Sequence, residues 1–132
     1  MPSNRWINDR RKFQRLSVNI SLSYIVESPL EVSNLYQGRE IEAAMLNISE
    51  GGIGLLSKYN IPARSIIVVR FNLFRTDRQG FISFSDPIEV ICEVRYSVIM
   101  EDGQYRMGVV FRGVKDTAKS EITTFMESAL HM

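Results

Sequence analysis

Four cations lie within six residues near the N-terminus of this sequence, in the segment Arg10-Arg11-Lys12-Phe13-Gln14-Arg15. An arginine guanidinium presents a planar fork of donors, which can grip a phosphate, pair with O6 and N7 of guanine, or stack on a base. Like charges this close repel one another, so they are best tolerated when an anion binds among them. The segment therefore indicates either an anion-binding arm or a solvated tail, and its charge alone does not choose between them.

A second polar segment, Asn47-Ile48-Ser49-Glu50-Gly51-Gly52, interrupts an otherwise regular strand pattern. Asn47 and Ser49 have the same parity, so in an extended chain an amide and a hydroxyl point to one side and can read the edge of a base. Gly51 and Gly52 permit positive φ and a close approach of backbone to ligand. The same residue types also build ordinary tight turns, and by itself the segment favours that simpler interpretation.

Period-two alternation of apolar and polar residues predicts six strands, with turns between them. They are expected at residues 16–26, 39–45, 53–56, 67–73, 88–98 and 105–111. Asp102-Gly103 between the last two is a strong hairpin signal. One face of the fifth strand is expected to point inward, and it consists of Ile88, Val90, Cys92, Val94, Tyr96 and Val98. Residues 28–38 are expected to form a loop, and residues 75–87 are less regular.

An amphipathic helix is expected at about residues 116–131, with Asp116 as its N-cap. Its apolar stripe, spaced by three and four residues, is formed by Ile122, Phe125, Met126, Ala129 and Leu130. No helical pattern separates the strands, which disfavours a parallel α/β sheet. Six amphipathic antiparallel strands favour a closed barrel without exposed edges. We expect residues 1–15 to be a flexible basic arm and residues 16–132 to be a β-barrel with this C-terminal helix.

The composition fits one globular domain, with 132 residues of which 45% are hydrophobic and 23% charged. A single cysteine cannot form an internal disulfide, and neither an apolar leader nor a membrane-length apolar run is present, so we expect a cytoplasmic protein. Residues 1–15 carry five cations and one carboxylate, a balance of +4; the whole chain sums to +1, so residues 16–132 sum to −3. A basic arm on a mildly acidic body argues against broad nucleic-acid binding.

Few side chains could support catalysis. His131, the only histidine, is expected at a solvated helix end, and Cys92 is expected in the core. One histidine and one cysteine do not make a clustered soft-metal site. Glu89 and Glu93 are expected on the polar exterior, and no phosphate-binding or dinucleotide-binding fingerprint is present. We therefore expect no enzyme, no catalytic residue, no metal and no cofactor.

Taken together, the two polar segments resemble the motifs of the PilZ family, whose members bind the bacterial second messenger cyclic di-GMP. Residues 11–15, Arg-Lys-Phe-Gln-Arg, match the family's RxxxR motif, and residues 47–52 match [D/N]xSxxG one strand–loop–strand later. The strands at Arg95-Tyr96 and at residues 107–111 also look like the family's closing strands. The resemblance covers the chain from about Asp9 to the C-terminal helix, and it implies a six-stranded antiparallel Greek-key barrel.

The resemblance implies roles for the arginines. Arg11 and Arg15 would clamp the guanine and phosphate groups of cyclic di-GMP. Arg10 would stack a further cation on a base, which goes with a ligand bound as an intercalated dimer. Lys12 would stay solvated and Phe13 would pack.

The resemblance also implies that Asn47 and Ser49 hydrogen-bond a guanine edge and that Gly52 leaves room for the turn around it. Asn47 stands where the family more commonly has Asp. The amide keeps the acceptor oxygen but loses the charge, which excludes a salt bridge between this residue and the arginine arm.

Three functions are in competition. The first is a cyclic di-GMP receptor in which the ligand folds the arm onto the barrel and changes the surface offered to an unidentified protein partner. The second is a non-binding PilZ-type interaction module of pilus or motility assemblies, although such members usually lose motif residues that this chain keeps. The third is a single-strand nucleic-acid-binding barrel, which would need exposed aromatics in a basic groove, whereas here most strand aromatics are expected to face inward.

Overall fold

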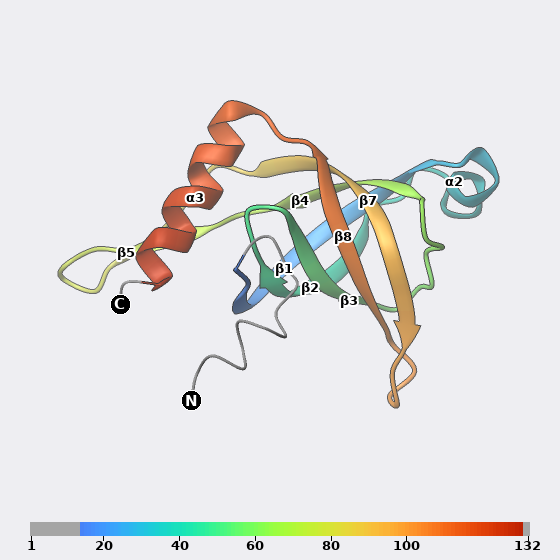
Figure 1. Cartoon of the computed structure of the whole chain (residues 1–132), viewed down its shortest axis with the longest axis horizontal. Coiled ribbons are helices and arrows are strands. Elements are labelled where there is room, and N and C mark those ends of the chain that lie inside the picture. Colours follow the sequence, from blue (N-terminus) through green and yellow to red (C-terminus); the bar gives the residue numbers. More distant parts are fainter. Residues whose placement is uncertain (1–13, 131–132) are drawn as a thin grey trace.

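The computed structural model describes residues 14–130, and its main body is a closed antiparallel barrel (Figure 1). Six strands follow the order β1-β2-β3-β8-β7-β4, and β4 pairs with β1 to close the barrel. The barrel strands are β1 Leu16–Ser28, β2 Ile41–Ile48, β3 Gly52–Ser57, β4 Ile66–Phe71, β7 Ile88–Ile99 and β8 Tyr105–Gly113. The predicted six-stranded antiparallel barrel is confirmed.

The barrel interior is filled by the inward residues of the alternating strands. On β1, Ile20, Leu22, Tyr24 and Val26 are all buried, as their alternation predicts. The hydroxyl of Tyr24 shares a 2.6 Å hydrogen bond with Ser57 Oγ on β3, which satisfies the one polar atom of this side chain. Burial raises the pKa of Tyr24 to about 12. Cys92 is fully buried, as expected, and burial raises the pKa of its thiol to about 12.

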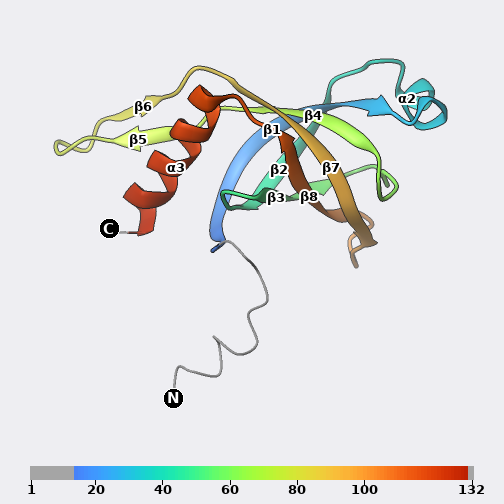
Figure 2. The same ribbon diagram turned by 45° about the horizontal axis from the view of Figure 1, so that its top comes forward.

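Helix α3 (Asp116–Leu130) closes one end of the barrel together with a small hairpin (Figure 2). The predicted helix is confirmed, but Asp116 is its first residue and Lys115 holds the N-cap position, because the carbonyl of Lys115 accepts the N–H of Lys119. On the apolar face of the helix, Ala118, Ile122, Phe125 and Met126 are buried. Phe125 meets Phe74 edge-to-face, with ring centroids 5.4 Å apart. Within residues 14–130, no helix has the length and apolar character needed to cross a membrane.

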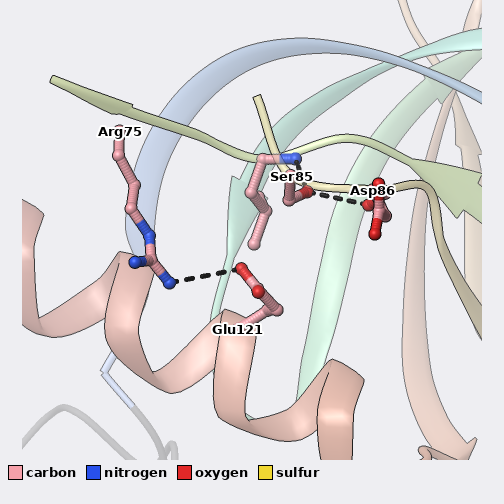
Figure 3. A network of polar contacts seen from close by, with 5 residues as sticks. Arg75, Ser85, Asp86 and Glu121 are labelled. Carbon is pink, nitrogen blue, oxygen red and sulfur yellow. Dashed lines mark hydrogen bonds and ion pairs between the residues drawn. The ribbon is translucent and has the colours of Figure 1, made fainter. Parts of the chain in front are cut away.

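The hairpin consists of β5 (Phe74–Thr76) and β6 (Ile82–Phe84), which form a separate two-stranded sheet. Arg75 reaches Glu121 on α3 in a 3.4 Å ion pair (Figure 3). After β6, Ser85 Oγ accepts the N–H of Leu73 and donates to the carbonyl of Asp86, which ties the base of the hairpin together. The Phe74–Phe125 ring contact and the Arg75–Glu121 ion pair dock the hairpin against α3.

Helix α2 (Leu30–Tyr36) occupies the segment that was expected to be a loop, at the opposite end of the molecule from the hairpin (Figures 1 and 2). It has no fully buried residue. Val32 and Tyr36, four residues apart, pack their partly buried side chains against the core. The loop prediction was wrong because Pro29 and Gly38 lie just outside the helix, where they delimit it instead of breaking it.

A β-bulge interrupts β7 between Val94 and Tyr96. Beyond it, Ser97 lies opposite the buried Met107, whereas Tyr96 lies opposite Gly108. Tyr96 and Val98 are 44% and 51% exposed. The prediction that these two side chains face inward was wrong, because the extra residue of a bulge inverts the alternation of every residue that follows it.

Candidate ligand-binding site

A tight turn at residues 49–52 joins β2 to β3, and Ser49 holds it together. The backbone N–H of Ser49 donates to the carbonyl of Gly52 at 2.9 Å. The Oγ of Ser49 accepts the N–H groups of Gly51 and Gly52 at 3.1 and 3.2 Å. The Ser49 side chain is buried, with 3% of its surface exposed. Its hydroxyl therefore fixes the shape of the turn from inside.

Two expectations about this segment need correction. The two side chains were expected to act together, but the Ser49 hydroxyl is buried against the N–H groups of Gly51 and Gly52, whereas the Asn47 amide oxygen accepts the N–H of Gly54. Gly52 does not adopt positive φ, since the glycines that do are Gly38, Gly80 and Gly103. A Cβ at Gly52 would instead lie 2.2 Å from the carbonyl oxygen of Val109 on β8. Glycine is required there because two backbones approach each other closely.

Arg15 and Asn47, which belong to the two separate motifs, contact each other directly. Nη1 of Arg15 donates to Oδ1 of Asn47 at 2.6 Å, a charge-assisted hydrogen bond. The same oxygen accepts the N–H of Gly54 on β3 at 3.1 Å. The amide is thereby oriented with its oxygen toward the arginine and the neighbouring strand. Its Nδ2 group donates no hydrogen bond to residues 14–129.

Four of the six predicted ligand-binding residues come together around this contact: Arg15, Asn47, Ser49 and Gly52. Arg10 and Arg11 lie outside the described residues, as do Lys12, Phe13 and His131. The predicted base-stacking and clamping roles of Arg10 and Arg11 therefore stay predictions.

A row of directly opposed residues crosses the outer surface of the barrel from Asn47. Asn47 on β2 lies opposite Gly54 on β3, Gly54 lies opposite Gly108 on β8, and Gly108 lies opposite Tyr96 on β7. Directly opposed residues share one face of a sheet, so all four residues lie on the outer face. We call Gly54 and Gly108 the glycine floor, and Asn47 and Tyr96 flank it on either side. Reasoning from the sequence missed this row, although a glycine inside a strand pattern is itself a sign of close approach.

The site lies on the open surface of the barrel. A groove of about 1030 Å³, lined by residues that include Arg39, Glu42 and Arg70, lies elsewhere and contains none of the predicted ligand-binding residues that the structure describes. In the part of the chain that the structure describes, no group of three or more histidine, cysteine or carboxylate side chains could hold a metal ion. The predicted ligand-binding residues that the structure describes are polar side chains and a glycine: Arg15, Asn47, Ser49 and Gly52.

The PilZ domain family model matches residues 9–128 of this sequence. The chain belongs to the PilZ family. The match covers both motifs and the whole barrel. No curated protein matches the sequence.

Several solved structures share this PilZ fold at low sequence identity. The inhibitor of motility MotI/DgrA of Bacillus subtilis superimposes with a TM-score of 0.65 and 16% identity, over 93% of this chain and 53% of that one. The PilZ domain of YcgR from Escherichia coli, solved with c-di-GMP, gives a TM-score of 0.55 and 14% identity, over 92% and 95%. The MrkH–c-di-GMP complex of K. pneumonia gives a TM-score of 0.61 and 13% identity, over 92% of this chain and 53% of that one.

This PilZ chain therefore spans about half the length of the MotI/DgrA and MrkH chains and nearly all of the isolated YcgR domain. At identities this low, the likeness establishes the fold.

Proposed function

We propose that this chain is a cyclic di-GMP receptor without a catalytic step of its own. The observation that carries the proposal is the hydrogen bond between Arg15 and Asn47. It joins residues 32 positions apart in sequence, one from each motif of a nucleotide-binding family. The structures of the YcgR PilZ domain and of MrkH, both of the same fold, contain c-di-GMP and support the choice of ligand.

The donors at the site complement a guanine. Guanine presents two acceptors, O6 and N7, on one edge. The Nδ2 group of Asn47 is a donor aimed away from the oxygen that Arg15 and Gly54 occupy. We expect Nδ2 to donate to a guanine acceptor, while Arg15 binds a phosphate or the same base edge. Ser49 would act by holding the turn that positions Asn47.

Three arginines are insufficient by themselves. Charge-assisted hydrogen bonds contribute about 1.5–3 kcal/mol each, so Arg10, Arg11 and Arg15 would supply roughly 5–9 kcal/mol. Micromolar binding needs about 8 kcal/mol, and the cost of ordering the arm must also be met. Contacts on the barrel surface, including base stacking, must therefore add to the binding free energy.

Ligand binding would fold the arm onto the barrel and change the surface offered to a protein partner. We expect two ligands per chain, as an intercalated dimer in which Arg10 stacks on a base. A second candidate function, a protein-interaction module, is favoured by three exposed apolar side chains of the β5–β6 hairpin and its turn. Phe81, Ile82 and Phe84 are 69%, 62% and 71% exposed.

Isothermal titration with cyclic di-GMP tests the proposal. The wild-type chain should bind with micromolar or tighter affinity, with two ligands per chain. Arg15→Ala should weaken binding by at least about tenfold, because it removes a charge-assisted hydrogen bond worth about 1.5–3 kcal/mol. The matched control is Arg39→Ala, an exposed arginine that lines the groove elsewhere on the barrel, and it should bind like the wild type.

An unchanged affinity in Arg15→Ala would contradict the site. A wild-type chain that ignores the messenger but binds its protein partner would favour the interaction module. Displacement of labelled messenger by an unstructured oligonucleotide would favour the nucleic-acid-binding alternative.

A further inference from the structure

The aromatic ring of Tyr96 covers Gly108 on the adjacent strand. A Cβ placed on Gly108 would lie 2.2, 2.6 and 2.9 Å from Cε2, Cζ and Cδ2 of the ring. These three atoms are consecutive around the ring, so the Cε2 side of the ring occupies the space above Gly108. The ring therefore lies against the sheet, in the space that any side chain at position 108 would fill.

The amide of Asn47 covers the other half of the glycine floor in the same way. A Cβ on Gly54 would lie 2.5 Å from Nδ2 of Asn47. Gly54 and Gly108 are directly opposed, and the Cβ positions of such a pair are about 4.5–5.5 Å apart. The Asn47 amide and the Tyr96 ring therefore lie side by side on the barrel surface, although their strands are separated by two others.

Covering a glycine is a known way for an aromatic residue to stabilise a sheet, and it accounts for the inner face of the ring. It leaves the outer face open, since Tyr96 is 44% exposed. The packing against Gly108 also holds the ring in place before any ligand arrives, which lowers the ordering cost of binding. A flat, pre-positioned aromatic surface is what a nucleobase stacks on.

The charges beside the ring suit a nucleotide. Arg95 directly precedes Tyr96, and Arg106 lies two residues from Gly108 on the same outward face of β8. Both are exposed, and neither forms an ion pair with a residue of the described part of the chain. An aromatic ring near two exposed cations matches a base with its phosphates.

We propose that Tyr96 is a ligand-binding residue whose outer ring face stacks on a guanine base while the edge of that base meets the Asn47 amide. The inference rests on the proposed function, and it extends the site from the β2–β3 motif across the glycine floor to β7.

Titration of Tyr96 variants with cyclic di-GMP tests this role. Tyr96→Ala should lose about 5- to 150-fold in affinity, the usual range for one stacked base. Tyr96→Phe keeps the ring and should bind within about twofold of the wild type. Tyr96→Leu keeps apolar cover over Gly108 without an aromatic face, so it should fold and still lose at least about fivefold. The control Val98→Ala lies on the same outward face, opposite Arg106, and should bind like the wild type.

The outcomes separate the two proposals. If the wild-type chain binds, Arg15→Ala loses binding, and both Tyr96→Leu and Tyr96→Ala bind normally, the role of Tyr96 is overturned and the receptor stands. An equal loss of affinity in Tyr96→Leu and Val98→Ala would also overturn it, since any change on this face of β7 would then weaken binding. No titration by the wild-type chain would overturn both proposals together.

Discussion

Asn47 and Tyr96 sit at opposite edges of the glycine floor and are built alike, because each covers a glycine on the neighbouring strand. They differ in what holds them. The Asn47 side chain is fixed by two hydrogen bonds through Oδ1, whereas the Tyr96 side chain makes none with residues 14–129 and is held by packing on Gly108. The polar edge of the glycine floor is therefore set by directional bonds, and the aromatic edge by packing. Replacing a glycine by alanine adds one methyl group, and such substitutions at the floor and at the neighbouring Gly52 test this difference.

Gly52→Ala should have the largest effect, because the obstacle to its Cβ is backbone. The 2.2 Å approach to the carbonyl oxygen of Val109 can be relieved only by separating β3 from β8. We expect the free energy of unfolding to fall by about 2–4 kcal/mol, measured by urea denaturation.

The matched control for this change is Gly113→Ala. Its nearest neighbour would be the flexible Cδ1 of Ile91 at 3.3 Å, so the stability should change by less than about 0.5 kcal/mol. Equal effects at both positions would contradict the requirement for a close backbone approach at Gly52.

Gly54→Ala should have the next largest effect. The added Cβ would push the Asn47 amide away and break its hydrogen bonds with Gly54 and Arg15. We expect a loss of about 1–3 kcal/mol in stability, together with at least tenfold weaker binding of cyclic di-GMP by calorimetry. Normal affinity in a folded Gly54→Ala protein would show that the orientation of Asn47 is irrelevant to the ligand.

Gly108→Ala should cost less in stability, about 0.5–1 kcal/mol, because the partly exposed ring of Tyr96 can swing outward. Alanine is also the better strand residue, which offsets part of the loss. Affinity should nevertheless fall as in Tyr96→Leu, since the ring is no longer held flat. A comparison of urea denaturation with calorimetry on this one variant checks the contrast, and a stability loss larger than that of Gly54→Ala would reverse it.

Asn47→Asp should have a small effect on stability, of the opposite sign to that of the glycine substitutions. A carboxylate beside Arg15 converts the hydrogen bond into an ion pair, which should add about 0.5–1 kcal/mol of stability at pH 7. The guanidinium would lower the pKa of the folded carboxyl below its unfolded value of about 3.9. The gain is therefore present above that pH and lost as the pH falls through the folded pKa. Urea denaturation of both proteins at pH 7 and pH 3 measures it, and a gain that persists at pH 3 would refute the ion pair.

The sequence predicts the regular elements well, because burial on one face leaves a periodic pattern in long strands and helices. The 13-residue β1 and 15-residue α3 are of this kind. The short elements α2, β5 and β6 were not predicted from this pattern. All residues of β5 and β6 are exposed and each strand has three residues, while α2 has no buried residue. Where nothing is fully buried, no such pattern exists to detect.

The residues considered for the ligand-binding site also differ in whether the sequence predicts them. The sequence predicts Arg15, Asn47, Ser49 and Gly52 as ligand-binding residues because they match the two motifs of the family. Tyr96 was assigned to the core, since its spacing from Val94 fits an uninterrupted strand. A single bulge in β7 reversed that assignment.

The amino-acid sequence by itself determined the barrel, its terminal helix and the polar motif, since each follows from residue types and spacings within one segment. Only the tertiary structure decided that Arg15 reaches Asn47, that the hydroxyl of Ser49 is buried inside its turn, and that Tyr96 lies over Gly108. These contacts depend on strand register, which is set by pairing between segments far apart in the chain. Local alternation carries no record of that register once a bulge has shifted it.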